Sequence, residues 1–186
     1  MSQSESTKNK ILQSAVKIFA EKGYWKTKVS DIVTNAGFSQ GSFYNCFSSK
    51  EDCFKEILLS THNETIQNIE ALLQSNKGKD NVSSLLKYLN RRFREIKDIA
   101  KVFIYEAVTS SHELRKIYQS FKTKNFEIVY MILKETDAEY AYEKAFLISG
   151  FIKNMVETLI IEENVPVEKI DLMIENIIKI ICKESV

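Results

Sequence analysis

The chain contains very few of the residues that reverse a polypeptide. It has 5 glycines and 1 proline in 186 residues, about 3% of the chain against about 12% in average usage. An all-β sandwich or barrel needs a turn about every 8 to 12 residues, which so few turn residues do not supply. Hydrophobic residues make up 44% and charged residues 27%, a balance unlike that of disordered or membrane-spanning chains. The sequence therefore predicts an all-α protein.

Basic and acidic residues nearly cancel, with 26 Lys and Arg against 25 Asp and Glu and a net charge of +1. A domain that coats nucleic acid usually has a clear basic excess, so the average argues against one. The charge is unevenly distributed, however. Residues 1–28 hold six lysines and two glutamates, a net charge of +4. The sequence thus predicts a basic N-terminal region followed by a slightly acidic remainder.

The polar N-terminus has no apolar stretch that would serve as a signal core. The most apolar run, 145–161, is interrupted by Lys153 and Glu157 and is too short to span a bilayer. The three cysteines, of which Cys46 and Cys53 are the closest in sequence, form no C-x-x-C pair. These features predict a cytoplasmic protein without a membrane segment.

Nothing in the pattern indicates an enzyme. His62 and His112 are the only histidines, and neither has carboxylate or cysteine neighbours at metal-ligand spacing. No nucleophile and base are paired in the sequence. We therefore expect no catalytic residue, no metal and no cofactor. A redox role for Cys46 is a minor alternative.

Apolar residues at helical spacing predict a first helix over about 8–22, with Ser6 and Thr7 as N-caps and Gly23 just past its end. Thr27 is the expected cap of a second helix. The buried face of that helix would consist of Val29, Ile32, Val33 and Ala36.

Gly37 would supply the positive φ of a sharp turn after the second helix. Ser39 is the expected cap of a very short third segment over about 40–46. Ser49, with Asp52 three residues later, resembles the capping box that begins a helix. The N-terminal quarter is thus predicted to consist of short helices and tight turns.

Long helices are expected in the remainder of the chain. Their predicted ranges are 50–75, 82–98, 100–109, 112–135, 139–163 and 167–183. Pro166 stands where the last of them can begin.

A short helix, a glycine turn and a second short helix that opens with small polar residues form the helix-turn-helix pattern. The residues that make up this pattern are Ile11, Leu12, Ala15, Phe19, Lys22, Gly23, Tyr24, Thr27, Asp31, Ile32, Val33, Ala36, Gly37, Phe38, Ser39, Gly41, Ser42, Phe43, Tyr44, Phe47, Lys50 and Glu51. In this stretch the chain resembles the N-terminal domain of the tetracycline-repressor (TetR) family of bacterial transcriptional regulators, over residues 6–56.

The resemblance implies a homodimeric repressor that binds a palindromic double-stranded DNA operator and is released by a small-molecule effector. It implies a DNA-binding domain over 1–50, with its recognition motif at about 28–47, and a ligand-binding and dimerisation domain over 51–186. The chain departs from the family pattern at Val33, at Gln40 and at Cys46. These departures indicate a different operator or weaker phosphate binding on the same fold.

The DNA-binding residues are expected to divide by chemistry. Helix N-termini attract phosphates, which makes Thr27, Lys28 and the first amides of the second helix candidates, together with Tyr44 and Lys50. Gln and Asn amides pair with adenine; the candidates on the third segment are Gln40, Ser42 and Asn45, with Ser39 as a cap that also reaches DNA. Gly41 would allow close approach of the backbone. The plainer alternatives are that Tyr44 borders the core and that Gln40 and Asn45 face water, whereas Phe43 and Phe47 are expected in the core.

After the predicted DNA-binding domain of residues 1–50, which we call the head, aromatic residues are frequent. A cavity lined by aromatic side chains is a natural small-molecule site. The predicted pocket residues are His62, Ile66, Phe93, Tyr105, Phe126, Tyr130, Phe151 and Met155, which suit a largely apolar effector. The alternative for each of them is ordinary packing. Arg91, Arg92 and Arg94 are expected to form a solvated face with Glu95 and Asp98, or else to bind an anionic effector.

The last two predicted helices are apolar around most of their circumference, and helices apolar on both sides need a second partner. We therefore expect a homodimer through a four-helix interface, with Gly150 allowing close approach, although burial in a single large core is an alternative. The leading interpretation is a ligand-controlled DNA-binding regulator. The alternative is a protein-interaction module that has kept the fold and lost DNA binding.

Overall fold

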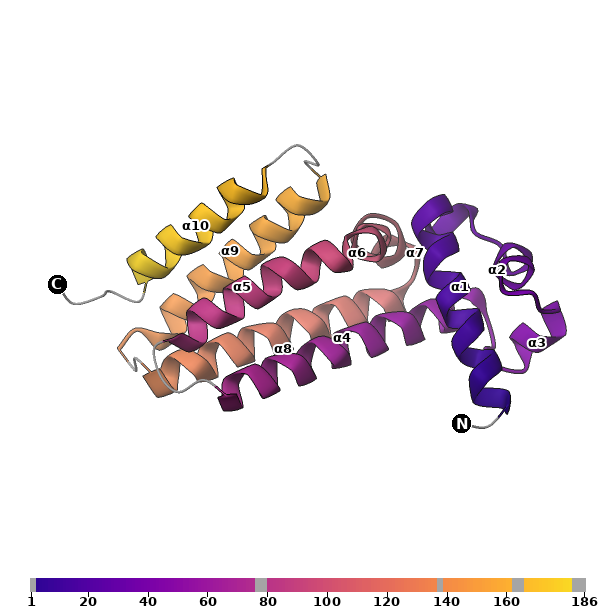
Figure 1. Cartoon of the computed structure of the whole chain (residues 1–186), viewed down its shortest axis with the longest axis horizontal. Coiled ribbons are helices and arrows are strands. Elements are labelled where there is room, and N and C mark those ends of the chain that lie inside the picture. The colour runs from indigo at the N-terminus through magenta and orange to yellow at the C-terminus, as the bar shows by residue number, and fades with distance from the viewer. Residues whose placement is uncertain (1–2, 76–79, 137–138, 162–165, 182–186) are drawn as a thin grey trace. The chain divides into compact units, whose positions relative to one another are not determined.

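The computed structural model describes residues 3–75, 80–136, 139–161 and 166–181. The elements within these ranges are all helices, which confirms the all-α prediction (Figure 1). The chain forms two compact units: unit 1 is Met1–Glu64 with Asp98–Arg115, and unit 2 is Thr65–Lys97 with Lys116–Val186. The predicted division at residue 50 concerns function and stays a prediction.

Unit 1 contains α1 (Gln3–Lys26), α2 (Val29–Ala36), α3 (Gln40–Tyr44), the first part of α4 (Lys50–Ser75), most of α6 (Lys97–Val102), the π-helix η1 (Phe103–Ala107), α7 (Val108–Ser110) and the start of α8 (His112–Thr136). Its core is built on an aromatic cluster. The ring of Phe19 lies 4.7 Å from that of Phe54 and 5.9 Å from that of Tyr24, measured between centroids. These rings join α1 to α4.

The start of α1 differs from the prediction. The helix begins at Gln3, so Ser6 and Thr7 lie inside its first turns and do not cap it. The helical path breaks at Gly23, as predicted, because this residue has φ 78° and ψ 170°. Short polar residues are tolerated within a first helical turn, so their presence does not mark the boundary to the residue.

Unit 2 contains α5 (Asp80–Glu95), α9 (Ala141–Ile161) and α10 (Val167–Ile181) with the remaining parts of α4 and α8. Figure 1 shows α5 beside α9 and α10. Leu86, Ile148 and Ile174, one from each of these helices, are at most 1% exposed. Asn90 is also buried and donates a hydrogen bond of 2.6 Å to Asp171 Oδ1 on α10.

The long helices follow the predicted ranges closely. The range 50–75 coincides with α4, and Pro166 directly precedes α10, as expected. The break predicted near residue 99 lies at residue 96 instead, between α5 and α6. The predicted ends at 163 and 183 lie outside the described residues. Within the described residues, no helix is both long and apolar enough to cross a membrane.

Candidate nucleic-acid interface

Two caps define the turn between α2 and α3. Gly37 ends α2 with φ 74° and ψ 31°, and the following Phe38 N–H donates to Val33 O at 2.9 Å, which closes the helix end. Ser39 is the N-cap of α3, and its Oγ accepts a hydrogen bond of 3.2 Å from Ser42 N. Both positions were predicted from residue type, because these caps use local hydrogen bonds.

Helix α3 has one apolar and one polar face. Phe43 is 0% exposed and Phe47, just after the helix, is 2% exposed, which confirms both as core residues. Gln40, Gly41 and Asn45 are exposed on the same short segment. A surface of amide groups and bare backbone is therefore held by two buried aromatic rings.

Tyr44 lies on the exposed face, with 56% of its surface accessible and its ring packed edge-on against Phe43 at 5.5 Å between centroids. Ser42 is half-buried, and its Oγ lies 3.0 Å from Ser39 Oγ, so both hydroxyls belong to the cap. A Cβ added at Gly41 would meet only Ser39 Oγ, at 3.6 Å. Packing within the chain therefore does not require glycine at this position.

Thr27 does not cap α2 as the sequence predicted. Its hydroxyl donates to Gly23 O at 2.6 Å and lies 3.4 Å from Ile18 O, in a side chain that is only 2% exposed. The break at Gly23 leaves carbonyl groups at the end of α1 without helical partners, and Thr27 satisfies them. The N-cap residue of α2 is Lys28, whose side chain is exposed.

Lys50 is half-buried rather than extended into solvent. Its Nζ donates to Tyr24 O at 2.7 Å and to Thr27 O at 2.9 Å, and it lies 4.5 Å from the centroid of the Tyr24 ring. Burial lowers the pKa of the Lys50 ammonium, and the charge of Glu106 opposes that shift. The ammonium therefore connects α4 to the end of α1, a role that sequence spacing did not reveal.

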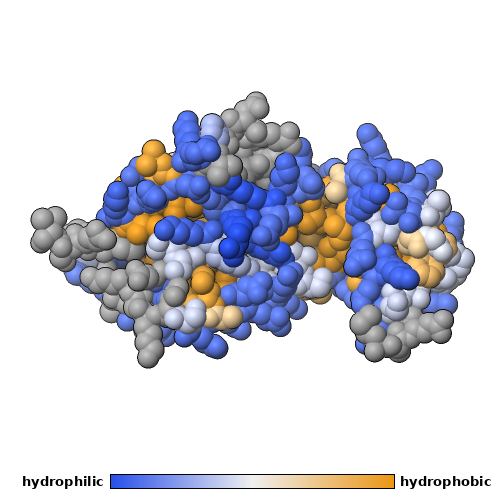
Figure 2. Space-filling view, in the orientation of Figure 1, coloured by the Kyte–Doolittle hydropathy of each residue, from blue (hydrophilic) through white to orange (hydrophobic). Residues whose placement is uncertain are grey.

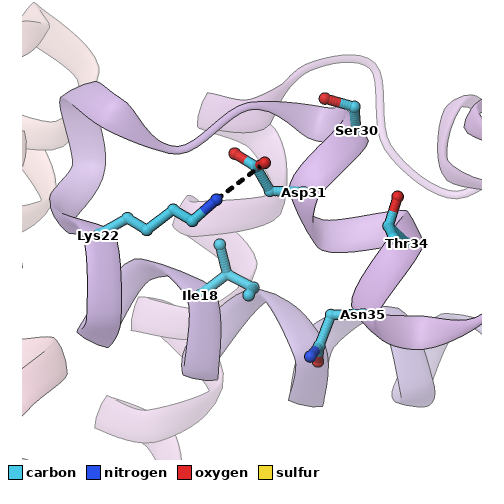
Figure 3. A pocket seen from close by; sticks show the side chains of 6 residues that line it. All are labelled: Ile18, Lys22, Ser30, Asp31, Thr34 and Asn35. Atoms are coloured by element: carbon cyan, nitrogen blue, oxygen red, sulfur yellow. Dashed lines mark ion pairs between the residues drawn. The ribbon is translucent and has the colours of Figure 1, made fainter.

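Asp31 links the start of α2 to α1. Its Oδ1 lies 2.9 Å from Lys22 Nζ (Figure 3). Its Oδ2 accepts a hydrogen bond of 2.9 Å from Lys28 N. The contact with Lys22 and the backbone hydrogen bond from Lys28 lower the pKa of the Asp31 carboxyl. A carboxylate in the first turn also complements the positive end of α2.

We expect replacement of Asp31 by asparagine to reduce the sensitivity of unit 1 to acid. Because the Asp31 pKa is lower in the folded than in the unfolded chain, its stabilisation is full above the ordinary range of a carboxyl group and is lost as pH falls through the folded pKa. Melting followed by circular dichroism at about pH 7 and about pH 3 tests this. The difference in Tm between the parent chain and Asp31→Asn should be larger at the higher pH. An equal difference at both pH values would contradict the assignment.

A shallow hollow of about 300 Å³ lies between α1 and α2, and the sequence did not predict it. Its lining residues are Ile18, Lys22, Ser30, Asp31, Thr34 and Asn35 (Figure 3). The buried Ser14 of α1 donates to Ile32 O at 2.7 Å, and its Oγ lies 3.0 Å from Oδ1 of the lining residue Asn35. These hydrogen bonds join the two helices.

The predicted effector residues are divided between the two units. His62 and Tyr105 belong to unit 1, and the other six belong to unit 2: Ile66, Phe93, Phe126, Tyr130, Phe151 and Met155. In unit 2, Met155 is buried in the hydrophobic core, and Phe93, Phe126, Tyr130 and Phe151 pack against that core. The rings of Phe126 and Tyr130 stack at 6.4 Å. A ligand role for these residues stays a prediction.

The arginines of α5 are held by several groups. Arg92 pairs with Glu95 at 3.2 Å, as expected, and its Nε donates to Thr65 Oγ1. Arg94 donates to Asn90 Oδ1 at 3.1 Å, and the guanidinium of Arg91 lies 5.8 Å from the centroid of the Tyr88 ring.

The two cysteines in the described residues differ in exposure. Cys46 is half-buried, while Cys53 is buried, and burial raises the pKa of the Cys53 thiol to about 12.

Comparison with known proteins adds independent evidence. The model of the bacterial regulatory proteins of the tetR family matches residues 11–57, which contain α2, α3 and the turn between them. The HTH-type transcriptional regulator YvdT of Bacillus subtilis is 34% identical over 118 residues, 60% of this chain and 59% of that protein. The HTH-type transcriptional repressor KstR2 of Mycolicibacterium smegmatis is 42% identical over 57 residues, 31% of this chain and 28% of KstR2. The chain thus spans less than two thirds of the length of either relative.

A solved structure extends the likeness beyond the head. The crystal structure of a transcriptional regulator from Aquifex aeolicus has a TM-score of 0.79 and 26% identity, and the match covers 94% of this chain and 99% of that one. These similar proteins are regulators and not enzymes, in agreement with the prediction from sequence. Residues 11–57 thus form a domain of the tetR family of bacterial regulatory proteins, and the shared fold extends the similarity to regulators of this kind over the rest of the chain.

Proposed function

We propose that the chain is a transcriptional regulator that binds a palindromic operator as a dimer and releases it on binding a small-molecule effector. The observation that carries the proposal is the two-sided character of α3, where Phe43 and Phe47 are buried while Gln40, Gly41 and Asn45 face outward. A recognition helix needs this arrangement, since it must be held rigidly by one face and must present hydrogen-bonding groups with the other.

The exposed groups suit the two kinds of DNA contact. The amides of Gln40 and Asn45 provide paired donors and acceptors of the kind that read adenine in the major groove. Lys28 and Tyr44 are exposed on the same head and suit phosphate contacts, together with the first amides of α2. Thr27 and Lys50 support this surface from inside unit 1, because their polar groups are bonded to the end of α1.

Exposed apolar side chains on the last two helices support a dimer. On α9, Tyr142, Phe146 and Leu147 are 60% to 67% exposed, and on α10 Ile180 is 70% exposed. Figure 2 shows apolar patches over the helices of unit 2. Large exposed apolar groups on one pair of helices mark an interaction surface. Two heads one helical turn of DNA apart, about 34 Å, would read the two halves of a palindrome.

The aromatic residues of unit 2 support an apolar small molecule as the effector. Phe93, Phe126, Tyr130 and Phe151 are only partly buried and lie beside a core that contains Met155. An effector lowers DNA affinity only by the difference between its affinities for the DNA-binding and the released conformations. The repressor KstR2 matches the head at 42% identity, which supports repression as the direction of control.

Titration of the protein into a labelled duplex from the promoter of its own gene tests the proposal. We expect binding that weakens with added salt, at two chains per duplex. Gln40→Ala and Asn45→Ala should each cost about 1–3 kcal/mol and relax the preference at particular base pairs. The matched control is Gln67→Ala, an exposed amide of α4 in unit 2, which should bind as the parent chain does.

Two outcomes would count against this assignment. If both α3 variants bind as tightly and as selectively as the parent chain, α3 is not the reading helix. If the parent chain binds no duplex at any salt concentration, the DNA-binding function is wrong and the protein-interaction alternative takes its place.

A further inference from the structure

The segment of residues 23–28 runs from the break within α1 to the start of α2. We call it the α1–α2 corner. It begins at Gly23, where the helical path breaks, and it ends at Lys28, the N-cap of α2. Where a helical path breaks, backbone N–H and C=O groups lose regular helical partners, and several groups of this segment bond to side chains instead. The partners come from two distant parts of unit 1.

Two adjacent N–H groups of the corner, those of Tyr24 and Trp25, are bound by one carboxylate. Glu106 Oε2 accepts a hydrogen bond of 2.9 Å from Tyr24 N and one of 3.3 Å from Trp25 N. Glu106 belongs to the π-helix η1, 82 residues away from Tyr24 in sequence. Charge-assisted hydrogen bonds of this kind are about twice as strong as neutral ones.

Two C=O groups of the corner, those of Tyr24 and Thr27, are bound by one ammonium. Lys50 Nζ donates to Tyr24 O and Thr27 O, at 2.7 and 2.9 Å. The Glu106 carboxylate thus binds backbone N–H donors of this short segment, and the Lys50 ammonium binds backbone C=O acceptors of the same segment. Tyr24 takes part on both sides, because its N–H goes to Glu106 and its C=O goes to Lys50.

Glu106 is half-buried and lies next to buried apolar residues in sequence. The buried residues of the same helical stretch are Val102, Phe103 and Ala107, which are at most 6% exposed. A carboxylate that is partly removed from water is stabilised by hydrogen bonds such as those from Tyr24 N and Trp25 N. Gly23 makes the approach possible, since a Cβ at that position would lie 2.6 Å from Glu106 Oε1. A π-helical turn, which is often found at functional sites, carries the carboxylate to this position.

We propose that Glu106 is a positioning residue for DNA binding, which sets the geometry of the α1–α2 corner together with Lys50 and so the direction in which α2 and α3 leave α1. The inference rests on the proposed function, since it concerns the same DNA-reading surface. Glu106 itself lies outside the helix-turn-helix and outside residues 11–57, which match the family model.

The corner contains its own reporter. Trp25 is the only tryptophan of the chain, its side chain is 61% exposed, and its backbone N–H is one of the two bound by Glu106. Steady-state anisotropy of tryptophan fluorescence therefore reports motion of the corner on the nanosecond timescale. This signal is separate from the melting of the whole chain.

The test compares Glu106→Gln and Glu106→Ala with the parent chain. Glutamine keeps the shape of the side chain and loses its charge, and alanine removes both acceptors. We expect Trp25 anisotropy to fall and affinity for the promoter duplex to fall, by about tenfold for alanine and less for glutamine, since charge-assisted hydrogen bonds are lost. Helix content should stay unchanged.

Glu56→Gln is the matched control. It makes the same chemical change in unit 1 and removes the ion pair of 2.7 Å with Lys8, and it does not touch the corner. We expect it to leave Trp25 anisotropy and DNA affinity unchanged. If Glu106 only stabilised the fold, Glu56→Gln at an equal loss of Tm would change both readouts equally, and that result would overturn the proposal.

The two proposals fail in different ways. If the parent chain binds the duplex and Glu106→Ala binds equally well with unchanged anisotropy, the positioning role is wrong while the proposed function stands. If the parent chain does not bind, the proposed function fails, and the positioning role for DNA binding fails with it. In that case a lower anisotropy in Glu106→Ala shows only that Glu106 orders the corner.

Discussion

Replacement of Gly23 by alanine is expected to lower the free energy of unfolding of unit 1 by about 3 kcal/mol or more. At φ 78° and ψ 170° the residue occupies a backbone region that is essentially restricted to glycine. An added Cβ would also lie 2.6 and 2.7 Å from the two carboxylate oxygens of Glu106. The carboxylate would have to move and give up its hydrogen bonds to Tyr24 N and Trp25 N, and this loss adds to the backbone cost. Thermal or urea unfolding followed by circular dichroism measures the loss.

Gly37→Ala separates the two costs. Gly37 also has a positive φ, of 74°, but no atom lies within 4 Å of an added Cβ. This variant should lose only the free energy that a left-handed backbone costs a non-glycine residue, about 1–2 kcal/mol. Equal losses of unfolding free energy in Gly23→Ala and Gly37→Ala would mean that the Glu106 side chain moves away from the added methyl group without a measurable cost. A smaller cost of Gly23→Ala in a Glu106→Ala background would confirm the steric part, because contacting residues are not additive.

Replacement of Gly41 by alanine is expected to abolish most of the DNA affinity and leave the fold intact. A Cβ there meets only Ser39 Oγ at the ordinary distance of 3.6 Å, and Gly41 does not have a positive φ. Alanine favours a helix over glycine by up to about 1 kcal/mol, so Tm should stay the same or rise. The proposed close approach of α3 to DNA would leave no room for the methyl group. Overpacking of about 1–3 kcal/mol corresponds to a loss of about 10- to 100-fold in affinity.

The measurement is the dissociation constant for the promoter duplex beside the Tm of the same preparation. Lower affinity with an unchanged or higher Tm would separate the DNA contact from folding. Unchanged affinity would show that the backbone at Gly41 does not approach DNA closely. In that case Gln40 and Asn45 would have to reach the bases by their own length.

Local features of the site were predictable. Ser39 as a cap, Gly37 in a left-handed turn and the range of α4 all follow from interactions within about four residues along the chain. The burial of Phe43 and Phe47 follows from the apolar face of a short helix. Ser49 was also placed correctly, since its Oγ accepts from Asp52 N at 3.0 Å. The return contact was displaced by one residue, because the Asp52 carboxylate accepts from Ser48 N rather than from Ser49 N.

The sequence by itself thus determined the all-α class, most helix boundaries to within a few residues and the exposed polar face at α3, because periodicity and capping are local. Only the tertiary structure decided the roles of Thr27, Lys50 and Glu106. Thr27 lost its predicted cap because the break at Gly23 presents carbonyl groups to it. Lys50 and Glu106 bind Tyr24 across 26 and 82 residues of sequence. Contacts of that range depend on how helices pack, which no local pattern encodes.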